Sequence, residues 1–272
     1  MFKHFIITRF NLRLKEWSVT KHGDDVLSET WLANRFELFE TYCLPSVQQQ
    51  TNQNFVWLLC FDTKTPEVYK QKIEAIATTY SNIQLLYIDG QEQFSETISN
   101  TINQSLLETD THLITTRLDN DDAMHNTFVD TIQSHFKPQK QLTIDCTEGY
   151  QLILKQNKKP TLRKMHYVGN AFISLIEAKA NFKTVLSRRH NLWSEVPSIQ
   201  INTKRLWIQL VHQENISNAE KLQYPETNTF TSSDFAIDPK IELKSNLQIR
   251  FGNFWSLVQR VLIKLKIVSL PS

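Results

Sequence analysis

Glycine is scarce in this chain, with five residues among 272. Neither GxGxxG nor GxxxxGK[ST] occurs anywhere in the sequence. Both loops need several glycines so that the backbone can approach a phosphate closely. The sequence therefore excludes a Rossmann dinucleotide fingerprint and a P-loop.

Cysteine is also rare, and the number is odd: Cys43, Cys60 and Cys146. All three lie in apolar segments, and no CxxC or Cys/His zinc spacing exists. This usage is typical of reduced core residues, so we expect no disulfide framework and no zinc site.

An excess of charge is missing too, since 30 Lys and Arg face 28 Asp and Glu, with a pI of about 8.3. This balance gives no electrostatic basis for a nucleic-acid partner. No stretch approaches the roughly 20 uncharged apolar residues that cross a bilayer. The first residues, MFKHFIITRF, are interrupted by Lys3, His4 and Arg9 and do not form a signal peptide. We expect a cytoplasmic, globular protein.

Strand and helix patterns alternate through the first half of the chain. The predicted strands are 4–10, 55–62, 83–89 and a fourth that begins at His112 and ends at Asp119. The predicted helices are 28–43, with Ser28 as N-cap and Pro45 as its stop, 65–80, with Thr65 as N-cap before Pro66, and one carrying Ile98, Ile102 and Leu106. This alternation predicts an α/β fold with a parallel sheet and right-handed crossovers.

The second half is less regular. Residues 141–146 and 150–155 are predicted strands that could form an antiparallel hairpin around Thr147–Gly149, and 169–177 and 205–212 are further strand candidates. Residues 214–250 are polar and predict a long loop with short elements.

Three carboxylates follow the fourth strand in HLITTRLDNDDAM, at Asp119, Asp121 and Asp122. Crowded carboxylates raise one another's pKa unless a cation relieves them. Oxygen ligands favour Mg²⁺, Mn²⁺ or Ca²⁺, although the spacing does not fit an EF-hand. Open α/β sheets bind ligands at the carboxyl ends of their strands, where this cluster and Asp62 are expected. The alternative is a solvated turn in which Asp122 caps the next helix.

Several ordered motifs resemble a known family. LPSVQQQTNQNFVWLLCFD is similar to a segment of family 2-like glycosyltransferases, and LITTRLDNDDA resembles the DxD strand of their GT-A fold. With GNAFISLIE and WIQLVHQENISN, residues 1–220 resemble a bacterial rhamnosyltransferase family. The resemblance implies a Rossmann-like, mostly parallel sheet with a smaller antiparallel element.

The resemblance also implies roles for individual residues. Asp62 would contact the nucleotide base of a nucleotide-sugar donor, and Asp119 and Asp121 would hold Mn²⁺ or Mg²⁺ between its phosphates. His212 is a candidate further metal ligand. Arg9 and Arg117 could approach the same diphosphate. Each has a structural alternative: capping for Asp62, neutralisation of the carboxylates for Arg117, and ordinary packing or pairing for His212 and Arg9.

The general base for the acceptor hydroxyl is harder to place, because no clear E-D pair follows the DxD motif. By position the candidates are His190 and Glu195, with Glu177 as a third. Inversion and retention of the anomeric configuration both stay open.

The tail, residues 253–270, has apolar side chains at helical spacing among Arg260, Lys264 and Lys266. We divide the chain into a glycosyltransferase domain, 1–250, and an amphipathic basic helix, 251–272. That helix could lie on the inner face of a membrane, which would suit a lipid-linked acceptor, or pack on the domain.

We therefore expect a metal-dependent glycosyltransferase that moves a sugar, for example rhamnose, to a surface polysaccharide or other glycan. One alternative is a haloacid-dehalogenase-like phosphohydrolase, although its motif normally ends the first strand and is followed by Thr or Val where this chain has Ala123. The other is an inactive GT-A domain that binds glycans or acts as a scaffold.

Overall fold

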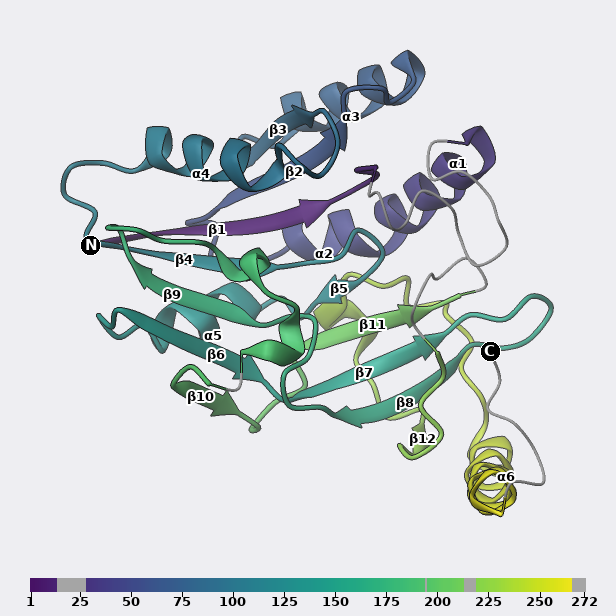
Figure 1. Cartoon of the computed structure of the whole chain (residues 1–272). Helices are drawn as coiled ribbons and strands as arrows, with labels where there is room; N and C mark the ends of the chain where they lie inside the picture. Colours follow the sequence, from purple (N-terminus) through teal and green to yellow (C-terminus); the bar gives the residue numbers. More distant parts are fainter. Residues whose placement is uncertain (14–27, 194, 213–218, 266–272) are drawn as a thin grey trace.

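A seven-stranded sheet forms the centre of the computed structural model, which describes residues 1–13, 28–193, 195–212 and 219–265 (Figure 1). The strand order is β10-β6-β9-β4-β1-β2-β3. The first four strands run parallel, as predicted, and β9 lies antiparallel between β4 and β6. The bounds are β1 Phe2–Arg9, β2 Val56–Asp62, β3 Ile83–Ile88, β4 His112–Arg117, β6 Gln141–Cys146, β9 Ser174–Ala178 and β10 Ser198–Ile201.

Helices cover both faces of this sheet, which explains why its strands lack polar alternation. Ile6 of β1 belongs to one buried cluster, with residues of α1, α2, α3 and α5. Its neighbour Ile7 points to the other face and packs with residues of α4. The bounds are α1 Glu29–Leu38, α2 Leu44–Gln48, α3 Glu67–Thr79, α4 Phe94–Ser105 and α5 Phe128–Ser134.

Two predicted helix boundaries are wrong. The first helix does not stop before Pro45, because a π-helical stretch, Phe39–Cys43, joins α1 to α2 and the helical run continues to Gln48. Proline is tolerated there because it lies in the first turn of α2, where its missing N–H is not needed. The N-cap of α3 is Pro66 and not Thr65, whose hydroxyl instead donates to the carbonyl oxygen of Asp62 at 2.6 Å.

A second sheet of five strands, in the order β12-β8-β7-β11-β5, lies beside the first (Figure 1). Its bounds are β5 Ala123–Met124, β7 Glu148–Ile153, β8 Thr161–His166, β11 Trp207–Val211 and β12 Glu226–Thr227. β11 pairs antiparallel with β5, with Ile208 opposite Ala123. This register brings the end of β11 to the loop that carries the acidic residues.

The predicted hairpin between residues 141–146 and 150–155 does not form. β6 and β7 belong to different sheets, and β7 pairs with β8 and β11 instead. The chain changes sheets at Thr147, whose N–H donates to Ile201 at 2.9 Å and whose carbonyl accepts from Tyr167 at 2.8 Å. The strand predicted over 169–177 is also shorter, because Gly169 has a φ of 70° and begins a turn.

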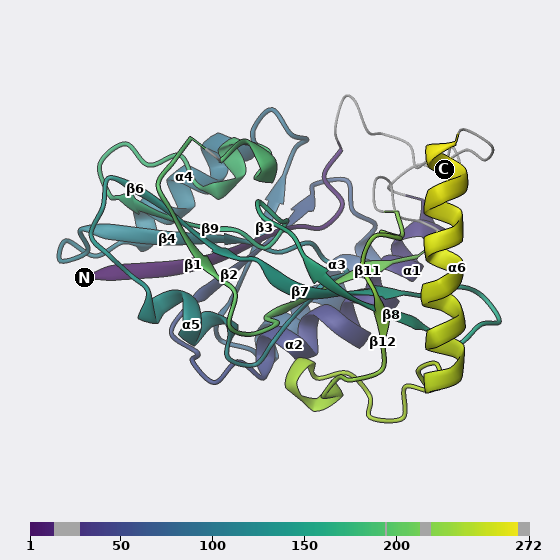
Figure 2. The ribbon, with the colours of Figure 1, turned by 90° about the horizontal axis from the view of Figure 1, so that it is seen from below.

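The C-terminal helix, α6, spans Asn246–Lys264 and lies against the outer edge of the second sheet (Figure 2). It begins five residues before the predicted boundary at 251, because Ser245 and Gln248 form a capping box. The last part of the predicted segment lies outside the described residues. Within the described part of the chain, no helix has the length and apolar character needed to cross a membrane.

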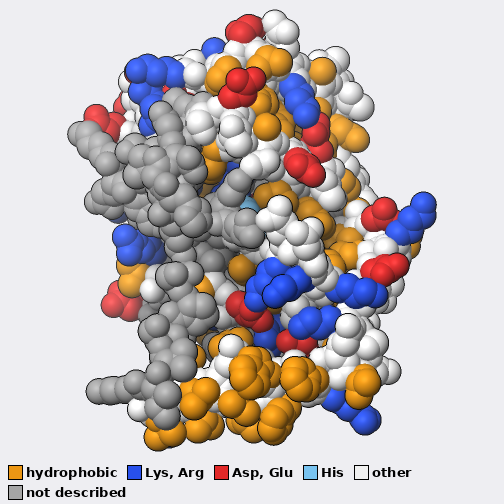
Figure 3. Space-filling view, turned by 90° about the vertical axis from the view of Figure 1, so that its right-hand side faces the viewer, with side chains coloured by type: hydrophobic (Ala, Val, Ile, Leu, Met, Phe, Trp, Pro, Cys, Tyr) orange, Lys and Arg blue, Asp and Glu red, His pale blue; other side chains and the backbone are white. Residues whose placement is uncertain are grey.

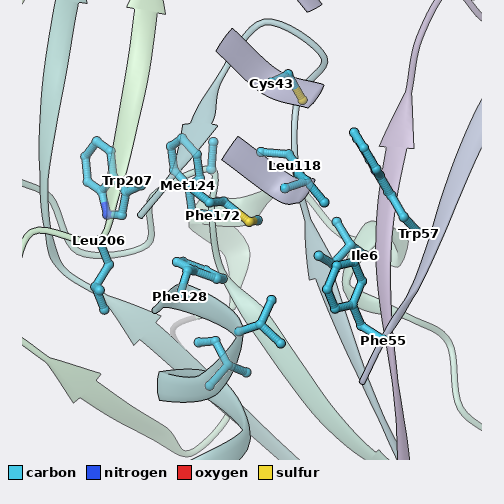
Figure 4. Close-up of a cluster of buried hydrophobic side chains, with 14 of the residues drawn as sticks. Ile6, Cys43, Phe55, Trp57, Leu118, Met124, Phe128, Phe172, Leu206 and Trp207 are labelled. Carbon is cyan, nitrogen blue, oxygen red and sulfur yellow. The ribbon is translucent and has the colours of Figure 1, made fainter. Parts of the chain in front are cut away.

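Trp207 packs where the two sheets meet (Figure 4). Its ring stacks on Phe172 at 4.9 Å between centroids, and its indole N–H donates to the carbonyl of Cys146 at 2.6 Å. The other side of the ring contacts Gly149, where an added Cβ would lie 2.1 Å from Cδ2 of Trp207. A glycine is therefore needed at this position of β7.

We expect Gly149→Ala to lower the free energy of unfolding by about 2–3 kcal/mol, because overpacking a dense core strains its neighbours. Urea denaturation measures the change. The double variant Gly149→Ala/Trp207→Leu serves as the control, since the smaller side chain removes the clash. If Gly149→Ala costs as much in the Trp207→Leu background as in the wild type, the close approach is not the cause.

Candidate active site

Charged side chains gather at the carboxyl ends of β1, β2 and β4. Arg9 is the last residue of β1, Asp62 of β2 and Arg117 of β4. The acidic loop, residues 119–122, follows Arg117 directly. The structure thus brings most of the predicted donor residues to one edge of the sheet, the edge at which open α/β sheets bind ligands.

The three aspartates of the acidic loop have different partners. Asp119 accepts from the guanidinium of Arg117, with its closest contact at 2.9 Å. Asp121 is buried, and its Oδ2 lies 2.5 Å from Nη1 of Arg35 and 3.0 Å from Nε2 of His212. Asp122 accepts from the backbone N–H of Leu210 at 2.9 Å through Oδ1.

The pKa values of Asp121 and Asp122 are shifted in opposite directions. Burial alone would raise the pKa of Asp121, but Arg35 and the hydrogen bond with His212 outweigh it and lower that pKa below its ordinary value. Burial, followed by the charges of Asp121 and Asp119, raises the pKa of Asp122 well above its ordinary value. The Oδ2 atom of Asp122 has no hydrogen-bond partner among the described residues. Asp122 therefore serves the loop as a structural group, and the expected helix cap is not observed, since α5 begins at Phe128.

Arg35 was not singled out from the sequence. It lies on α1 with only 7% of its surface exposed, and its guanidinium packs 5.1 Å from the ring of Trp31. A second bond runs from Nη1 to the side-chain oxygen of Asn120 at 3.3 Å. The sequence does place Arg35 beside Leu32 and Phe36, on the apolar side of the predicted helix. An arginine buried there needs an acidic partner, and this could have pointed to the acidic loop.

Arg9 has a different environment from the other two arginines. Burial and the nearby charge of Arg117 lower its pKa, while Asp119 acts in the opposite direction. Its guanidinium forms no hydrogen bond or ion pair with any residue that the structure describes. Arg9 thus provides a partly buried positive charge beside the acidic loop that can still receive an anion.

Asp62 is fully buried, and both of its carboxylate oxygens already accept hydrogen bonds. Its Oδ2 accepts from Nε of Arg13 at 2.8 Å, and its Oδ1 accepts from the N–H of Lys64 at 2.9 Å. Burial would raise the pKa of Asp62, but these hydrogen bonds lower it below its ordinary value. Arg13 also bonds Asp89. Arg13 was not singled out from the sequence, and it must move if Asp62 is to contact a nucleotide base.

Of the predicted bases, His190 lies nearest the acidic loop, close enough for the charges of Arg117 and Asp119 to act on its pKa. Its Nδ1 lies 2.5 Å from the carbonyl oxygen of Gly169. Because a carbonyl can only accept, Nδ1 carries the proton and Nε2 of the neutral ring keeps its lone pair. Burial lowers the pKa of His190. A buried carboxylate, Asp145, holds the turn by accepting from the N–H of Gly169 at 2.7 Å.

The other two candidate bases lie away from the acidic loop. The side chain of Glu195 is 87% exposed and lies 4.0 Å from Arg188. Glu177 pairs with Leu113 near the amino end of β4, roughly 13 Å of strand from Arg117. Its carboxylate accepts from the N–H groups of Lys183 and Thr184. The predicted role of Glu177 does not fit this position, and the role of Glu195 stays a prediction.

The predicted metal ligands are brought together in part. A separation of 3.0 Å between Oδ2 of Asp121 and Nε2 of His212 matches two ligands at about 2.1 Å from one ion with an angle of roughly 90°. Asp119 is turned toward Arg117 instead. Among the described residues no group of three His, Cys, Asp or Glu side chains is arranged to hold a metal. The donor set suits a divalent ion only if Asp119 or a ligand completes it.

We expect Arg35→Met to lower the free energy of unfolding by about 3 kcal/mol at neutral pH without added metal, because it removes the buried guanidinium that is paired with Asp121. The loss should shrink as pH falls, since the depressed pKa of Asp121 adds stability above the unfolded value of about 3.9 that is lost at lower pH. It should also shrink in the Asp121→Asn background.

Lys72→Met is the matched control for this prediction, because Lys72 pairs with Glu40 at 2.8 Å while both side chains are well exposed, at 42% and 37%. Its loss should stay below about 1 kcal/mol. Equal losses for the two variants in urea denaturation would show that the Arg35–Asp121 pair contributes no more than a surface pair.

Several solved structures resemble this chain, all at low sequence identity. S. aureus TarS 1-349 covers 76% of this chain at 10% identity with a TM-score of 0.42, and S. aureus TarS covers 77% at 11% identity with a TM-score of 0.40. The match spans 60% and 37% of those two chains. A 4-diphosphocytidyl-2C-methyl-D-erythritol synthase from Anaerococcus prevotii covers 93% of this chain, and 95% of its own length, at 13% identity with a TM-score of 0.31. Likeness at these TM-scores carries no argument about function.

No curated protein matches the chain significantly. The profile of the family described as "Putative rhamnosyl transferase" matches residues 7–224, which include the acidic loop, His190 and His212. The match thus includes strands of both sheets, and the structure confirms the predicted α/β class with a mostly parallel central sheet. Because the profile covers well over half of the chain, the protein belongs to this rhamnosyl transferase family.

Proposed function

We propose that the protein moves a sugar, with rhamnose as the first candidate, from a nucleotide-sugar donor to a surface polysaccharide or another glycan, and that Mn²⁺ or Mg²⁺ assists it. The proposed location is the cytoplasm or the inner face of a membrane. The observation that carries the proposal is the contact of Asp121 with His212 at the acidic loop, whose Asp119 lies close enough to Arg9 to act on its pKa.

The donor diphosphate is assigned to the space next to Arg9 and Arg117. Glycosyl transfer releases a nucleoside diphosphate, and fixed positive groups stabilise the negative charge that develops on it. Arg117 is available once Asp119 releases it, and Asp62 remains the candidate for contact with the nucleotide base after Arg13 moves.

The metal is assigned to Asp121 and His212, with Asp119 as the third protein ligand when it is free of Arg117. A divalent ion there would supply positive charge to the leaving diphosphate. Arg35 holds Asp121 ionised and in place, because it donates to the same carboxylate oxygen that faces His212.

His190 is proposed as the general base. The acceptor hydroxyl oxygen forms a bond to the anomeric carbon, the bond from that carbon to the diphosphate oxygen breaks, and the hydroxyl proton passes to Nε2 of His190. Two features support this role: the hydrogen bond to Gly169 leaves the Nε2 lone pair free, and burial keeps the ring neutral at neutral pH.

Family membership leaves the phosphohydrolase alternative without support. The inactive scaffold differs from the proposed enzyme in its response to ligands. A scaffold has no requirement for a nucleoside diphosphate, so nucleotide binding separates the two.

We expect one of UDP, GDP, dTDP and CMP to raise the melting temperature in the presence of Mn²⁺. A ligand at about 100 times its Kd adds roughly 2.7 kcal/mol to the folded state, which corresponds to roughly 5 °C or more for a chain of this size. Asp121→Ala should lose the shift. Asp130→Ala, at an exposed position of α5, should keep it. If no nucleotide raises the melting temperature of the wild type, the inactive scaffold becomes the favoured interpretation.

We expect transfer activity to fall only when the pH drops below the ordinary histidine value of 6.5, because burial lowers the pKa of His190 and the base must be neutral to accept a proton. His190→Ala should lower kcat by about 10²–10⁴-fold. The pH profile of kcat/KM for the wild type and the variant measures both effects.

His190→Asn separates catalysis from structure, because its amide can still donate to Gly169 but cannot accept the proton as imidazole does. It should be as inactive as His190→Ala while its melting temperature stays near the wild type. Glu195→Gln should keep full activity. An active His190→Asn enzyme would remove His190 from the proposed mechanism.

A further inference from the structure

α6 exposes a continuous row of apolar side chains. Leu247, Phe251, Phe254, Val261 and Leu265 recur at helical spacing and are 50–78% exposed, and we call them the outer face of α6. Trp255 and Leu257 beside them are exposed as well. In Figure 3 hydrophobic side chains form a band along the lower edge of the molecule, over α6. Val68 and Leu107 are also exposed, but they lie on other parts of the described structure.

The face that packs on the domain is small and polar instead. Ser256 accepts from Nη2 of Arg163 at 3.0 Å, and Asn253 accepts from the N–H of Glu226 at 2.6 Å. A Cβ added at Gly252 would lie 2.4 Å from Oε2 of Glu226. These contacts fix the rotation of α6 about its axis, so the helix cannot turn to bury its apolar residues. An ordinary surface helix turns its apolar side chains to the core and its polar side chains to solvent, whereas α6 does the opposite.

The charges of α6 have one sign. Its charged residues are Arg250, Arg260 and Lys264, and residues 246–272 contain no Asp or Glu. None of the three forms an ion pair with a residue in the described ranges. At helical spacing Arg250 and Lys264 lie along one flank of the outer face, and Arg260 lies further round the helix on the same side. Exposed apolar and aromatic side chains bordered by Lys and Arg are typical of helices that lie in a membrane interface.

We propose that the outer face of α6 docks the protein on an anionic lipid surface, with the helix lying in the interface. The charge pattern favours lipid over a second copy of this chain, because a two-fold contact between outer faces would bring Arg and Lys together with no acidic partner on either helix. The docking is independent of the proposed transfer reaction. If that reaction holds as well, α6 brings the site to lipid-linked acceptors.

The test is sedimentation of the full chain with vesicles of phosphatidylcholine alone or mixed with phosphatidylglycerol, without nucleotide. The wild type should bind the mixed vesicles and release them as salt rises. Phe251→Ser/Phe254→Ser/Val261→Ser should lower the partition coefficient at least about tenfold. Arg250→Gln/Arg260→Gln/Lys264→Gln should lower it by roughly fivefold for each charge removed.

Val68→Ser/Leu107→Ser is the matched control, since it removes exposed apolar side chains of similar exposure away from α6, and it should bind as the wild type does. Circular dichroism and the nucleotide-dependent melting shift report whether each variant is folded. Two results would overturn the proposal: equal binding of the wild type and the charge variant to the mixed vesicles, or no vesicle binding at all. The wild type could fail to bind vesicles and be a dimer that the Phe251→Ser/Phe254→Ser/Val261→Ser variant converts to a monomer. In that case the outer face binds a second copy of the chain.

Discussion

The buried carboxylate of Asp121 joins three parts of the chain that are far apart in sequence. It receives Arg35 from α1 and His212 from the end of β11, while it belongs itself to the loop after β4. An ionised carboxylate inside a protein is stable only with such partners. The first helix, the central sheet and the second sheet are thus held in register by one charged group, and the candidate site lies at that junction.

The positions of the site residues could be predicted from the sequence because they depend on strand ends. Apolar strands that alternate with helices indicate a parallel sheet, and its carboxyl edge then collects Arg9, Asp62 and Arg117. The identity of their partners depends on tertiary contacts that leave no local signal. Arg13 on Asp62 and the turn of Gly169 under His190 belong to this class. The same holds for the second sheet, because the pattern of β6 and β7 allows a hairpin as readily as two separate sheets.

The arginines and the histidine of the site differ in their charges and in their partners. Arg35 is committed to Asp121 and Arg117 to Asp119, whereas Arg9 has no acidic partner among the residues described. In the proposed function, Arg9 is therefore the first group assigned to the donor diphosphate, and Arg117 becomes available to it only when Asp119 releases it. His190 stays neutral beside them because it is partly buried and because Arg117 disfavours a second positive charge nearby.

The central place of β1 has a consequence for synthesis on the ribosome. β1 lies between β2 and β4, so its second edge is paired only when Arg117 has been made. At about 5–20 residues per second the apolar segment of Phe5, Ile6 and Ile7 waits roughly 5–20 s for that partner. A β-rich segment with an open edge is prone to aggregation during this time. The open edge of β1 is therefore a point at which the folding chain can aggregate until the fourth strand emerges.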